Sequence, residues 1–241
     1  MRYERQFEVF SVDAGHNSYV RPAVILRYLQ EAAVHQMLDE GPSYRQLFEK
    51  GYAFVVSRIN LQMYRPLYEY EHVTAQTWAC AEKGVTFGRS YRLLRGDEVI
   101  AEAFATWALL DMKSGTLVRT DEVDFHYGSD EPLPLPARFV FPRVPLIAVA
   151  QRQVQYEDVD CNGHLNNARY PDWLCNCIPD IDEVRVTGLQ IHFAAEARLG
   201  EPLTILRGEA DDGQTYVFET RRADGTCNIR ALITVQKEPT A

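Results

Sequence analysis

The signals for secondary structure occur in the same order in the two halves of the chain, and this repetition restricts the fold more than any other feature of the sequence. Each half predicts a strand, a polar turn, an apolar helix and then several strands rich in β-branched and aromatic residues. The first helix is predicted for residues 22–38, which begin at a proline and stop before Gly41. A shorter helix is predicted from Asn166 or Asn167 onward. The repeated order predicts a tandem duplication with units of about 120 residues.

Strand signals follow each helix, and a proline-rich segment separates the two halves. The predicted strands are residues 52–62, 72–81, 86–94 and 99–111 in the first half, with 116–119 as a short strand or a loop, and residues 152–156, 184–194, 203–208, 215–221 and 227–236 in the second. Residues 127–150 hold five of the twelve prolines, which neither a helix nor a central strand accommodates. We therefore predict an N-terminal unit (1–126), a linker (127–150) and a C-terminal unit (151–241). Each unit is expected to be α+β, with a helix wrapped by a curved antiparallel sheet.

Charge and composition exclude several classes of protein. The formal net charge of −9 argues against nonspecific nucleic-acid binding, which needs a basic surface. No apolar run approaches the ~18 residues of a membrane span, and the N-terminal residues lack the apolar block of a signal peptide. The five cysteines are interpreted as free thiols in a reducing cytoplasm, and no pair has a spacing suited to zinc. We expect a cytoplasmic protein that binds neither nucleic acid nor membrane and uses no metal or cofactor.

Three polar side chains occupy alternate positions just before the second helix signal: Asp160, Asn162 and His164. An imidazole moves protons near neutral pH, an amide can donate to a developing oxyanion, and a carboxylate can hold either group in place. The positive end of the helix dipole favours the same developing charge. Asp, Asn and Gly are also the usual residues of a turn before a helix. The spacing alone therefore fits a catalytic loop and an ordinary turn equally well.

This stretch also resembles a known family. The chain carries the run Asp160-x-Asn162-x-His164-x-Asn166-Asn167-x-x-Tyr170-x-x-Trp173, which resembles the signature of acyl-acyl carrier protein thioesterases, the FAT family of plants and bacteria. Further similarity lies in segments 28–33, 84–86, 105–111, 115–119 and 190–196, so that the resemblance covers almost the whole chain. It implies a tandem double hot-dog fold, in agreement with the repeat. The chain has no room for the N-terminal transit segment of plant members, so a bacterial type is implied.

The family's roles, carried over to this sequence, identify a catalytic network of Asp160, Asn162, His164 and Glu196. The resemblance implies that Glu196 activates a water, directly or together with His164. It also implies that Asn162 and His164 orient the thioester carbonyl and stabilise the charge on its oxygen, while Asp160 fixes their geometry. Many members have a cysteine directly after the glutamate. Here this position is Ala197, which favours direct hydrolysis by water.

The first half is expected to be catalytically silent. His16 matches His164 by its position in the repeat, but the asparagine that precedes His164 is absent there, so His16 is predicted to be structural. Tyr68 falls where Glu196 would lie when the two halves are aligned on their shared Leu-Gln pairs.

One cysteine lies inside the motif and needs a separate interpretation. Cys161 and His164 could act as nucleophile and base. If Asp160 and Asn162 point into the site from an extended segment, however, Cys161 points the other way. We therefore expect no covalent step at Cys161.

The resemblance implies that the first unit holds a long acyl chain. Removing such a chain from water is favourable, because each buried CH₂ contributes about 0.8 kcal/mol. Candidate substrate-binding residues near its helix and sheet are Tyr19, Val24, Leu29 and Trp107. The implied partner is an acyl carrier protein with a fatty acyl chain on its 4'-phosphopantetheine. A homodimer stays open, since a tandem already contains the two units that single hot-dog chains obtain by dimerising.

Three other functions are compatible with the residues. An acyl-CoA thioesterase would use the same fold and chemistry, and an arginine-lined pocket for the CoA phosphates would favour it. A hot-dog dehydratase or hydratase also pairs a histidine with a carboxylate, but the run around Asn162 and Glu196 fits a thioesterase better. A non-enzymatic acyl-binding protein would be indicated by loss of the catalytic residues, and all four are present.

Overall fold

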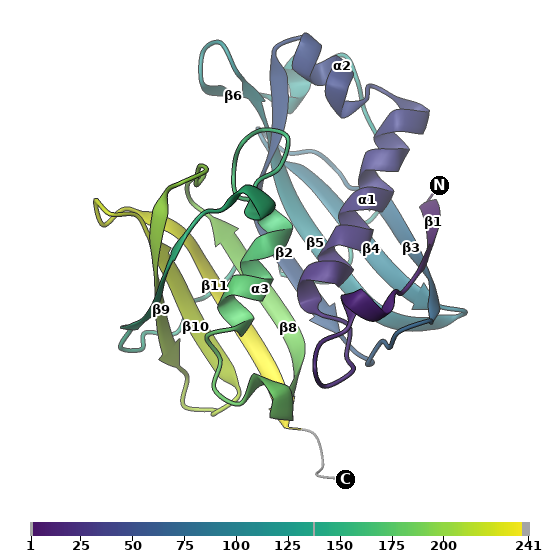
Figure 1. Cartoon of the computed structure of the whole chain (residues 1–241). Coiled ribbons are helices and arrows are strands. Elements are labelled where there is room, and N and C mark those ends of the chain that lie inside the picture. The colour runs from purple at the N-terminus through teal and green to yellow at the C-terminus, as the bar shows by residue number, and fades with distance from the viewer. Residues whose placement is uncertain (1, 137, 238–241) are drawn as a thin grey trace.

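One antiparallel sheet forms the framework of the protein, and α1 and α3 lie on one face of it (Figure 1). The computed structural model describes residues 2–136 and 138–237. Within these residues the sheet has 11 strands, and β6 stands off the main row because it pairs only with β5.

The bounds of the elements follow the sequence signals closely. The strands are β1 (Tyr3–Glu8), β2 (Tyr52–Met63), β3 (His72–Ala79), β4 (Phe87–Arg95), β5 (Glu98–Asp111), β6 (Thr116–Val118), β7 (Ile147–Gln153), β8 (Val184–Phe193), β9 (Pro202–Glu209), β10 (Thr215–Arg221) and β11 (Cys227–Lys237). The helices are α1 (Pro22–Glu40), α2 (Tyr44–Glu49) and α3 (Tyr170–Cys175), with single 3-10 turns at Ser11–Asp13, Thr120–Glu122, Tyr156–Asp158, Asn167–Arg169 and Ile181–Glu183.

The strand order confirms the duplication. Along the sheet the order is β1-β3-β4-β5-β2-β8-β11-β10-β9-β7. From the centre outward, the first unit runs β2, β5, β4, β3, β1, and the second runs β8, β11, β10, β9, β7. The two halves are therefore arranged symmetrically about the junction of β2 and β8. Together with the helix packed on each half, this is the tandem double hot-dog that the sequence predicts.

The two units share one hydrophobic core. At their junction β2 pairs antiparallel with β8, and Leu61 lies directly opposite Leu189. Both side chains are almost fully buried, and both belong to a core cluster that contains residues of α1 and α3 as well. Burial of this surface holds the units together as a single folding unit.

Helix α1 follows from its sequence. Pro22 occupies the first turn, where its missing N–H costs nothing, and the N–H of Gly41 closes the last turn on the carbonyl oxygen of Met37 (2.9 Å). Apart from Arg27, the residues of the first two turns are buried, as the apolar sequence predicts. Towards the end of the helix Val34 and Leu38 are exposed, so that the sheet wraps only part of α1.

The structure corrects the predicted boundary between the linker and the second unit. β7 begins at Ile147, which pairs with Arg207 of β9, so the last residues of the predicted linker 127–150 form a strand. The strand ends at Gln153, and Tyr156, which was predicted as its last residue, begins the 3-10 turn Tyr156–Asp158. Residues 146–153 contain no proline, so their backbone N–H groups are free to pair with a neighbouring strand.

Helix α2 was not predicted, although a signal for it exists. Ser43 is its N-cap: the Gln46 N–H donates to Ser43 Oγ (3.3 Å), and the Ser43 N–H donates to Gln46 Oε1 (2.8 Å). This reciprocal capping box identifies a helix start from a serine followed three residues later by glutamine. The short helix carries Tyr44 into the site described below.

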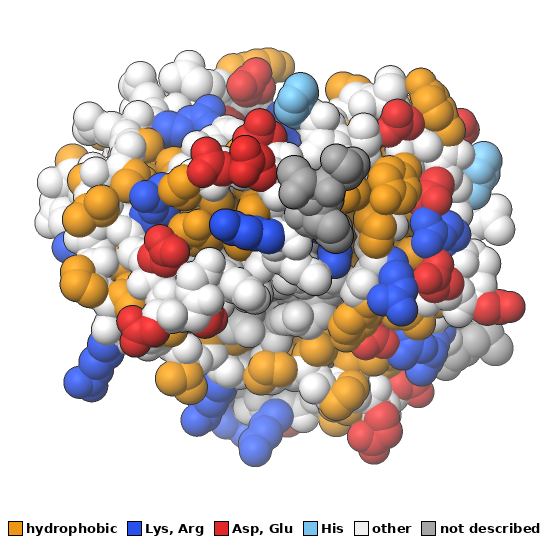
Figure 2. Space-filling view, turned by 90° about the horizontal axis from the view of Figure 1, so that it is seen from below, with side chains coloured by type: hydrophobic (Ala, Val, Ile, Leu, Met, Phe, Trp, Pro, Cys, Tyr) orange, Lys and Arg blue, Asp and Glu red, His pale blue; other side chains and the backbone are white. Residues whose placement is uncertain are grey.

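The exposed charges are mixed in sign. On the face of Figure 2, which views the molecule of Figure 1 from below, basic, acidic and hydrophobic side chains are interspersed. Such a face is not the continuous basic surface that nonspecific nucleic-acid binding requires. Within residues 2–136 and 138–237, no helix is both long and apolar enough to cross a membrane.

Candidate active site

The polar residues before α3 form a tight turn closed by backbone hydrogen bonds. The Asp160 N–H donates to the carbonyl oxygen of His164 (3.0 Å), and the Gly163 N–H donates to that of Asp160 (3.0 Å). Gly163 has a φ of 75°, a left-handed conformation that glycine adopts at little cost. Val159 and Leu165 form a β-bridge across the base of the turn. The backbone thus presents Asp160, Asn162 and His164 together.

Within the turn, Asp160 and Tyr44 fix the orientation of the Asn162 amide. Asp160 Oδ1 accepts from the Asn162 N–H (2.9 Å), and Asp160 Oδ2 accepts from Asn162 Nδ2 (3.4 Å). On the other side, Tyr44 Oη donates to Asn162 Oδ1 (3.2 Å). Burial raises the pKa of Tyr44, so its hydroxyl keeps the proton that it donates. The amide therefore has its NH₂ group on the side of the carboxylate.

The second pair of the site is an imidazole and a carboxylate. His164 Nε2 lies 3.2 Å from Glu196 Oε2. Their side chains are 26% and 51% exposed, so a water molecule can reach the carboxylate. A histidine and a glutamate in contact, with solvent access to the glutamate, are suited to proton transfer from water.

Glu196 lies in the loop between β8 and β9, and that loop is tied to the turn. The Leu165 N–H donates to the carbonyl oxygen of Ala197 (2.8 Å), and His164 forms a β-bridge with Arg198. The guanidinium of Arg222 donates to the carbonyl oxygen of Glu196. The backbone therefore places Glu196 beside His164, although they lie on different segments of the chain.

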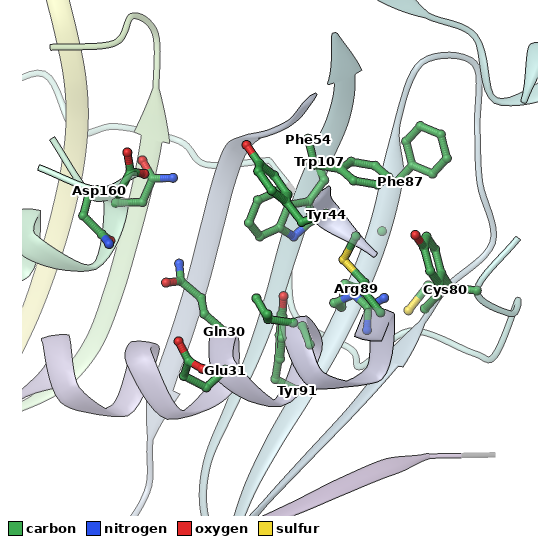
Figure 3. A pocket seen from close by; sticks show the side chains of 18 of the residues that line it. Gln30, Glu31, Tyr44, Phe54, Cys80, Phe87, Arg89, Tyr91, Trp107 and Asp160 are labelled. Atoms are coloured by element: carbon green, nitrogen blue, oxygen red, sulfur yellow. The ribbon is translucent and has the colours of Figure 1, made fainter. Parts of the chain in front are cut away.

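A cavity of about 390 Å³ lies next to the turn and reaches into the N-terminal unit. Its lining includes Gln30, Glu31, Ala33, Val34 and Met37 of α1, Tyr44 of α2, Phe54, Phe87, Arg89 and Trp107 of the sheet, and Asp160, Cys161, Asn162, Asn166 and Asn167 around the turn. Figure 3 shows Asp160 at one end and Arg89 and Cys80 towards the other, with Gln30 and Glu31 in between. One wall is therefore built by the first unit and one end by the second.

The residues predicted to bind the acyl chain lie in different surroundings. Trp107 lines the cavity from β5, and it meets Leu29 in a second space of only about 10 Å³. Among the described residues, Tyr19 and Val24 line neither space. Val24 is a core residue, and the ring of Tyr19 packs against that of Tyr68 at 5.7 Å between centroids. Any contact of these four with an acyl chain stays a prediction.

The repeat alignment predicted from sequence is wrong by a few residues at the turn. The first unit has its own turn of the same length: the Gly15 N–H donates to the carbonyl oxygen of Tyr19 (2.8 Å), and the Ser18 N–H donates to that of Gly15 (3.0 Å). Superposing the two hydrogen-bond patterns puts Tyr19, and not His16, in the position of His164.

The same correction applies to the loop of Glu196. The Val20 N–H donates to the carbonyl oxygen of Leu67 (2.9 Å), as the corresponding N–H of the second unit does to Ala197. The residue before Leu67 is Pro66, so Pro66, and not Tyr68, takes the position of Glu196. The alignment on the Leu-Gln pairs misses this shift, because Pro66 lies five residues after Leu61 whereas Glu196 lies seven residues after Leu189.

Cys161 is exposed and lines the cavity together with Asp160 and Asn162. The expectation that it points away from them is wrong, because the segment is a closed turn and not an extended strand. Within the part of the chain that the structure describes, no group of three or more His, Cys, Asp or Glu side chains could hold a metal ion.

The symmetric sheet, the paired turns and the large cavity define a tandem double hot-dog protein in which the second turn carries a carboxylate, an amide and an imidazole. Comparison with known proteins then identifies the family. The model for the acyl-ACP thioesterase N-terminal domain matches residues 1–124, and the model for the acyl-ACP thioesterase C-terminal domain matches residues 147–237. This chain belongs to the acyl-ACP thioesterase family.

Individual relatives agree with this assignment. The chain is 27% identical over 219 residues to the chloroplastic oleoyl-acyl carrier protein thioesterase 2 of Arabidopsis thaliana, covering 78% of this chain and 58% of that protein. The fold matches an acyl-ACP thioesterase from Bacteroides thetaiotaomicron with a TM-score of 0.89 at 21% identity, covering 98% of both chains. It also matches the 12:0-ACP thioesterase of Umbellularia californica with a TM-score of 0.78 at 16% identity, again covering 98% of both chains.

Proposed function

We propose that this protein hydrolyses the thioester of a fatty acyl-acyl carrier protein and releases a free fatty acid and the holo-carrier protein. The observation that carries the proposal is the contact between His164 Nε2 and Glu196 Oε2 (3.2 Å), next to a turn that also lines the large cavity. The membership of the chain in the acyl-ACP thioesterase family supports it.

In this proposal the N-terminal unit binds the acyl chain and the C-terminal unit performs the chemistry. The chain would lie in the cavity among Val34, Met37, Phe54 and Trp107. Each methylene removed from water contributes about 0.8 kcal/mol to binding. The thioester would then lie at the turn, beside Asn162, and the 4'-phosphopantetheine of the carrier would extend to the surface. The reaction is placed in the cytoplasm and needs no cofactor.

The hydrolytic step uses water as the nucleophile. The Glu196 carboxylate takes a proton from water while the water oxygen forms a bond to the thioester carbon. The second N–H of the Asn162 amide donates to the carbonyl oxygen as it becomes an oxyanion, and Asp160 and Tyr44 keep that amide in place. The C–S bond then breaks, and the proton held by the Glu196 and His164 pair passes to the thiolate.

The test is release of free thiol from acyl carrier proteins and acyl-CoAs with C8 to C18 chains. Wild type is expected to hydrolyse acyl carrier protein substrates. Glu196→Gln is expected to lower kcat by about 10²–10⁴-fold, since it removes the general base. His16→Ala is the matched control, because His16 is exposed and sits in the other turn. Preference for acyl-CoA would show that the substrate is carried by CoA and not by acyl carrier protein. Full activity of Glu196→Gln would overturn the proposed role of Glu196.

A further inference from the structure

A cluster of three buried polar side chains lies behind the loop of Glu196. Tyr170, Thr220 and Asn228 are 2%, 0% and 0% exposed. Tyr170 Oη donates to Asn228 Oδ1 (2.9 Å), and Thr220 Oγ1 donates to the same oxygen (2.8 Å). Asn228 Nδ2 in turn donates to the carbonyl oxygen of Ala195 (2.5 Å). Because two hydroxyl groups occupy Oδ1, the amide has one orientation, and its NH₂ group faces the residue before Glu196.

The cluster connects three elements of the second unit to this loop. Tyr170 begins α3, Thr220 belongs to β10, and Asn228 belongs to β11. The N–H groups of Ala194 and Ala195 also donate to the carbonyl oxygen of Asn228 (2.9 and 3.0 Å). Asn228 therefore holds the start of the loop through both its backbone and its side chain.

The first unit has the same backbone arrangement. There the N–H groups of Tyr64 and Arg65 donate to the carbonyl oxygen of Ile100 (2.8 and 3.3 Å). Ile100 lies in a bulge between β4 and β5, just as Asn228 lies in a bulge between β10 and β11. Ile100 is thus the counterpart of Asn228.

The other two members of the cluster have counterparts as well. Leu93 precedes the bulge of the first unit as Thr220 precedes that of the second. Ile25 lies five residues after Val20, as Tyr170 lies five residues after Leu165, the residue that closes the turn of the second unit. The counterparts Ile25, Leu93 and Ile100 are all apolar and at most 2% exposed. The three equivalent positions therefore form an apolar core in the first unit and a hydrogen-bonded network in the second.

Other supports of the loop are common to both units. In the second unit Glu201 pairs with Arg222 (2.8 Å) and accepts from the Arg198 N–H (3.0 Å). In the first unit Glu71 pairs with Arg95 (2.6 Å) and accepts in the same way from the backbone N–H three residues before it (3.0 Å). The counterpart loop of the first unit folds with an apolar core behind it, so this loop backbone does not itself require the polar cluster.

We propose that Asn228 is a positioning residue for Glu196, acting through the carbonyl group of Ala195, and that Tyr170 and Thr220 fix the amide that does so. The inference rests on the proposed function, in which Glu196 activates water. A carboxylate 3.2 Å from His164 Nε2 tolerates little displacement, and a misplacement of about 1 Å can cost about 10²-fold in rate. Burial raises the pKa of Tyr170, so its hydroxyl stays protonated and keeps donating.

The first test gives the second unit the residue of the first. Asn228→Ile is expected to lower kcat by about 10–10²-fold, with KM for acyl carrier protein changed less than about 2-fold. KM is expected to hold because Asn228 is fully buried and is not among the residues that line the cavity. If the single variant does not fold, the triple variant Tyr170→Ile, Thr220→Leu and Asn228→Ile transfers the whole apolar set and is expected to show the same loss.

A matched pair isolates the hydrogen bond from the packing. Thr220→Ser keeps the hydroxyl donor and is expected to stay within about 2-fold of wild-type kcat, whereas Thr220→Val keeps the shape and is expected to lose more than about 5-fold. Ile100→Val in the first unit is the stability control, expected to lower Tm without changing kcat.

Four outcomes separate the claims. Loss of kcat in Asn228→Ile and Thr220→Val, with unchanged circular dichroism and KM, supports the inference. A lowered Tm with unchanged kcat per folded molecule means that the cluster is only structural and overturns it. If Glu196→Gln itself is fully active, the proposed role of Glu196 fails and the inference fails with it, whereas a wild-type protein that releases no thiol from any thioester overturns the proposed function.

Discussion

The turns at residues 15–19 and 160–164 have the same backbone and different side chains. Both are closed by the same two hydrogen bonds, and both place a left-handed residue at the fourth position, Ser18 with φ of 62° and Gly163 with φ of 75°. An asparagine occupies the third position of each. Only the second turn adds a carboxylate at its first position and an imidazole at its last. The difference teaches that both units build the same turn backbone, so the turn itself does not require the carboxylate and the imidazole to which we assign the proposed chemistry.

The helices that follow the two turns, α1 and α3, differ in length. α1 begins at Pro22 and has 19 residues, whereas the second unit has the 3-10 turn Asn167–Arg169 at the corresponding position and then α3, with 6 residues. The part of α1 without a counterpart in α3 begins at Glu31 and carries Ala33, Val34 and Met37, which line the cavity. The unit with the long helix therefore supplies most of the cavity wall, and the unit with the short helix supplies Asp160, Asn162 and His164. In the proposed function, the first unit therefore holds the acyl chain and the second unit performs the chemistry.

Filling the cavity from the additional turns of α1 would sharpen this division. Ala33 is 8% exposed and lines the cavity. Ala33→Phe is expected to lower kcat/KM for C16 and C18 substrates by about 10–10²-fold, because each excluded methylene loses about 0.8 kcal/mol. C8 substrates serve as the internal control and are expected to change little. Equal loss for all chain lengths would show that the cavity does not hold the acyl chain.

The buried Asp13 of the first unit should make the stability of the fold depend on pH in the acidic range. Burial alone raises the pKa of Asp13, but hydrogen bonds from Tyr28, Arg27 and the Phe10 N–H outweigh it, so that the pKa lies below its ordinary value. Its charged form therefore stabilises the fold above pH ~4, and this contribution is lost as the pH falls through the folded pKa.

Asp13→Asn is expected to destabilise the protein by about 1–3 kcal/mol at pH 7 and to flatten the fall of stability below pH ~4. Urea unfolding at several pH values measures both effects, with the exposed Asp97→Asn as control. An unchanged acid dependence would contradict the ion pair of Asp13 with Arg27 (2.6 Å). Activity per folded molecule is expected to stay constant, since this aspartate belongs to the first unit.

The smallest effect is expected at the contact between the units. Tyr44→Phe removes the donor to Asn162 Oδ1, and a net hydrogen bond of about 1 kcal/mol corresponds to about 5-fold in kcat. Tyr64→Phe is the control, because its hydroxyl donates to Glu102 at the surface (3.1 Å). Equal activity of both variants would mean that Asp160 alone orients the amide.

The periodic features of the sequence predicted most of the fold. Runs rich in β-branched and aromatic residues located most strands to within a few positions, although no bounds were predicted for β1, and the apolar run after Pro22 located α1. The order of the elements was enough to identify the duplication. The boundary at β7 was missed because the proline-rich sequence continues to Pro145, two residues before the strand begins.

The site was predictable only where its residues are close in sequence. Asp160, Asn162 and His164 lie within five positions, and the family resemblance added Glu196. Tyr44 lies 118 residues before its partner Asn162, so only tertiary packing reveals it. Asn228 carried no local signal either, because a buried amide in a strand reads as a packing residue until its partners are known. The correct alignment of the two turns likewise came from their backbone hydrogen bonds and not from the sequence.

The most direct measurement compares the one residue type that both turns share. Asn162→Ala and Asn17→Ala delete the same side chain from the same position of the two turns. The Asn17 side chain bonds to backbone groups: Nδ2 donates to the carbonyl oxygen of Val184 (3.2 Å), and Oδ1 accepts from the Tyr19 N–H (3.2 Å). With acyl carrier protein substrates, kcat is expected to fall by about 10²–10³-fold in Asn162→Ala and by less than about 2-fold per folded molecule in Asn17→Ala. Equal losses in the two variants would contradict the claim that only the second unit performs the chemistry.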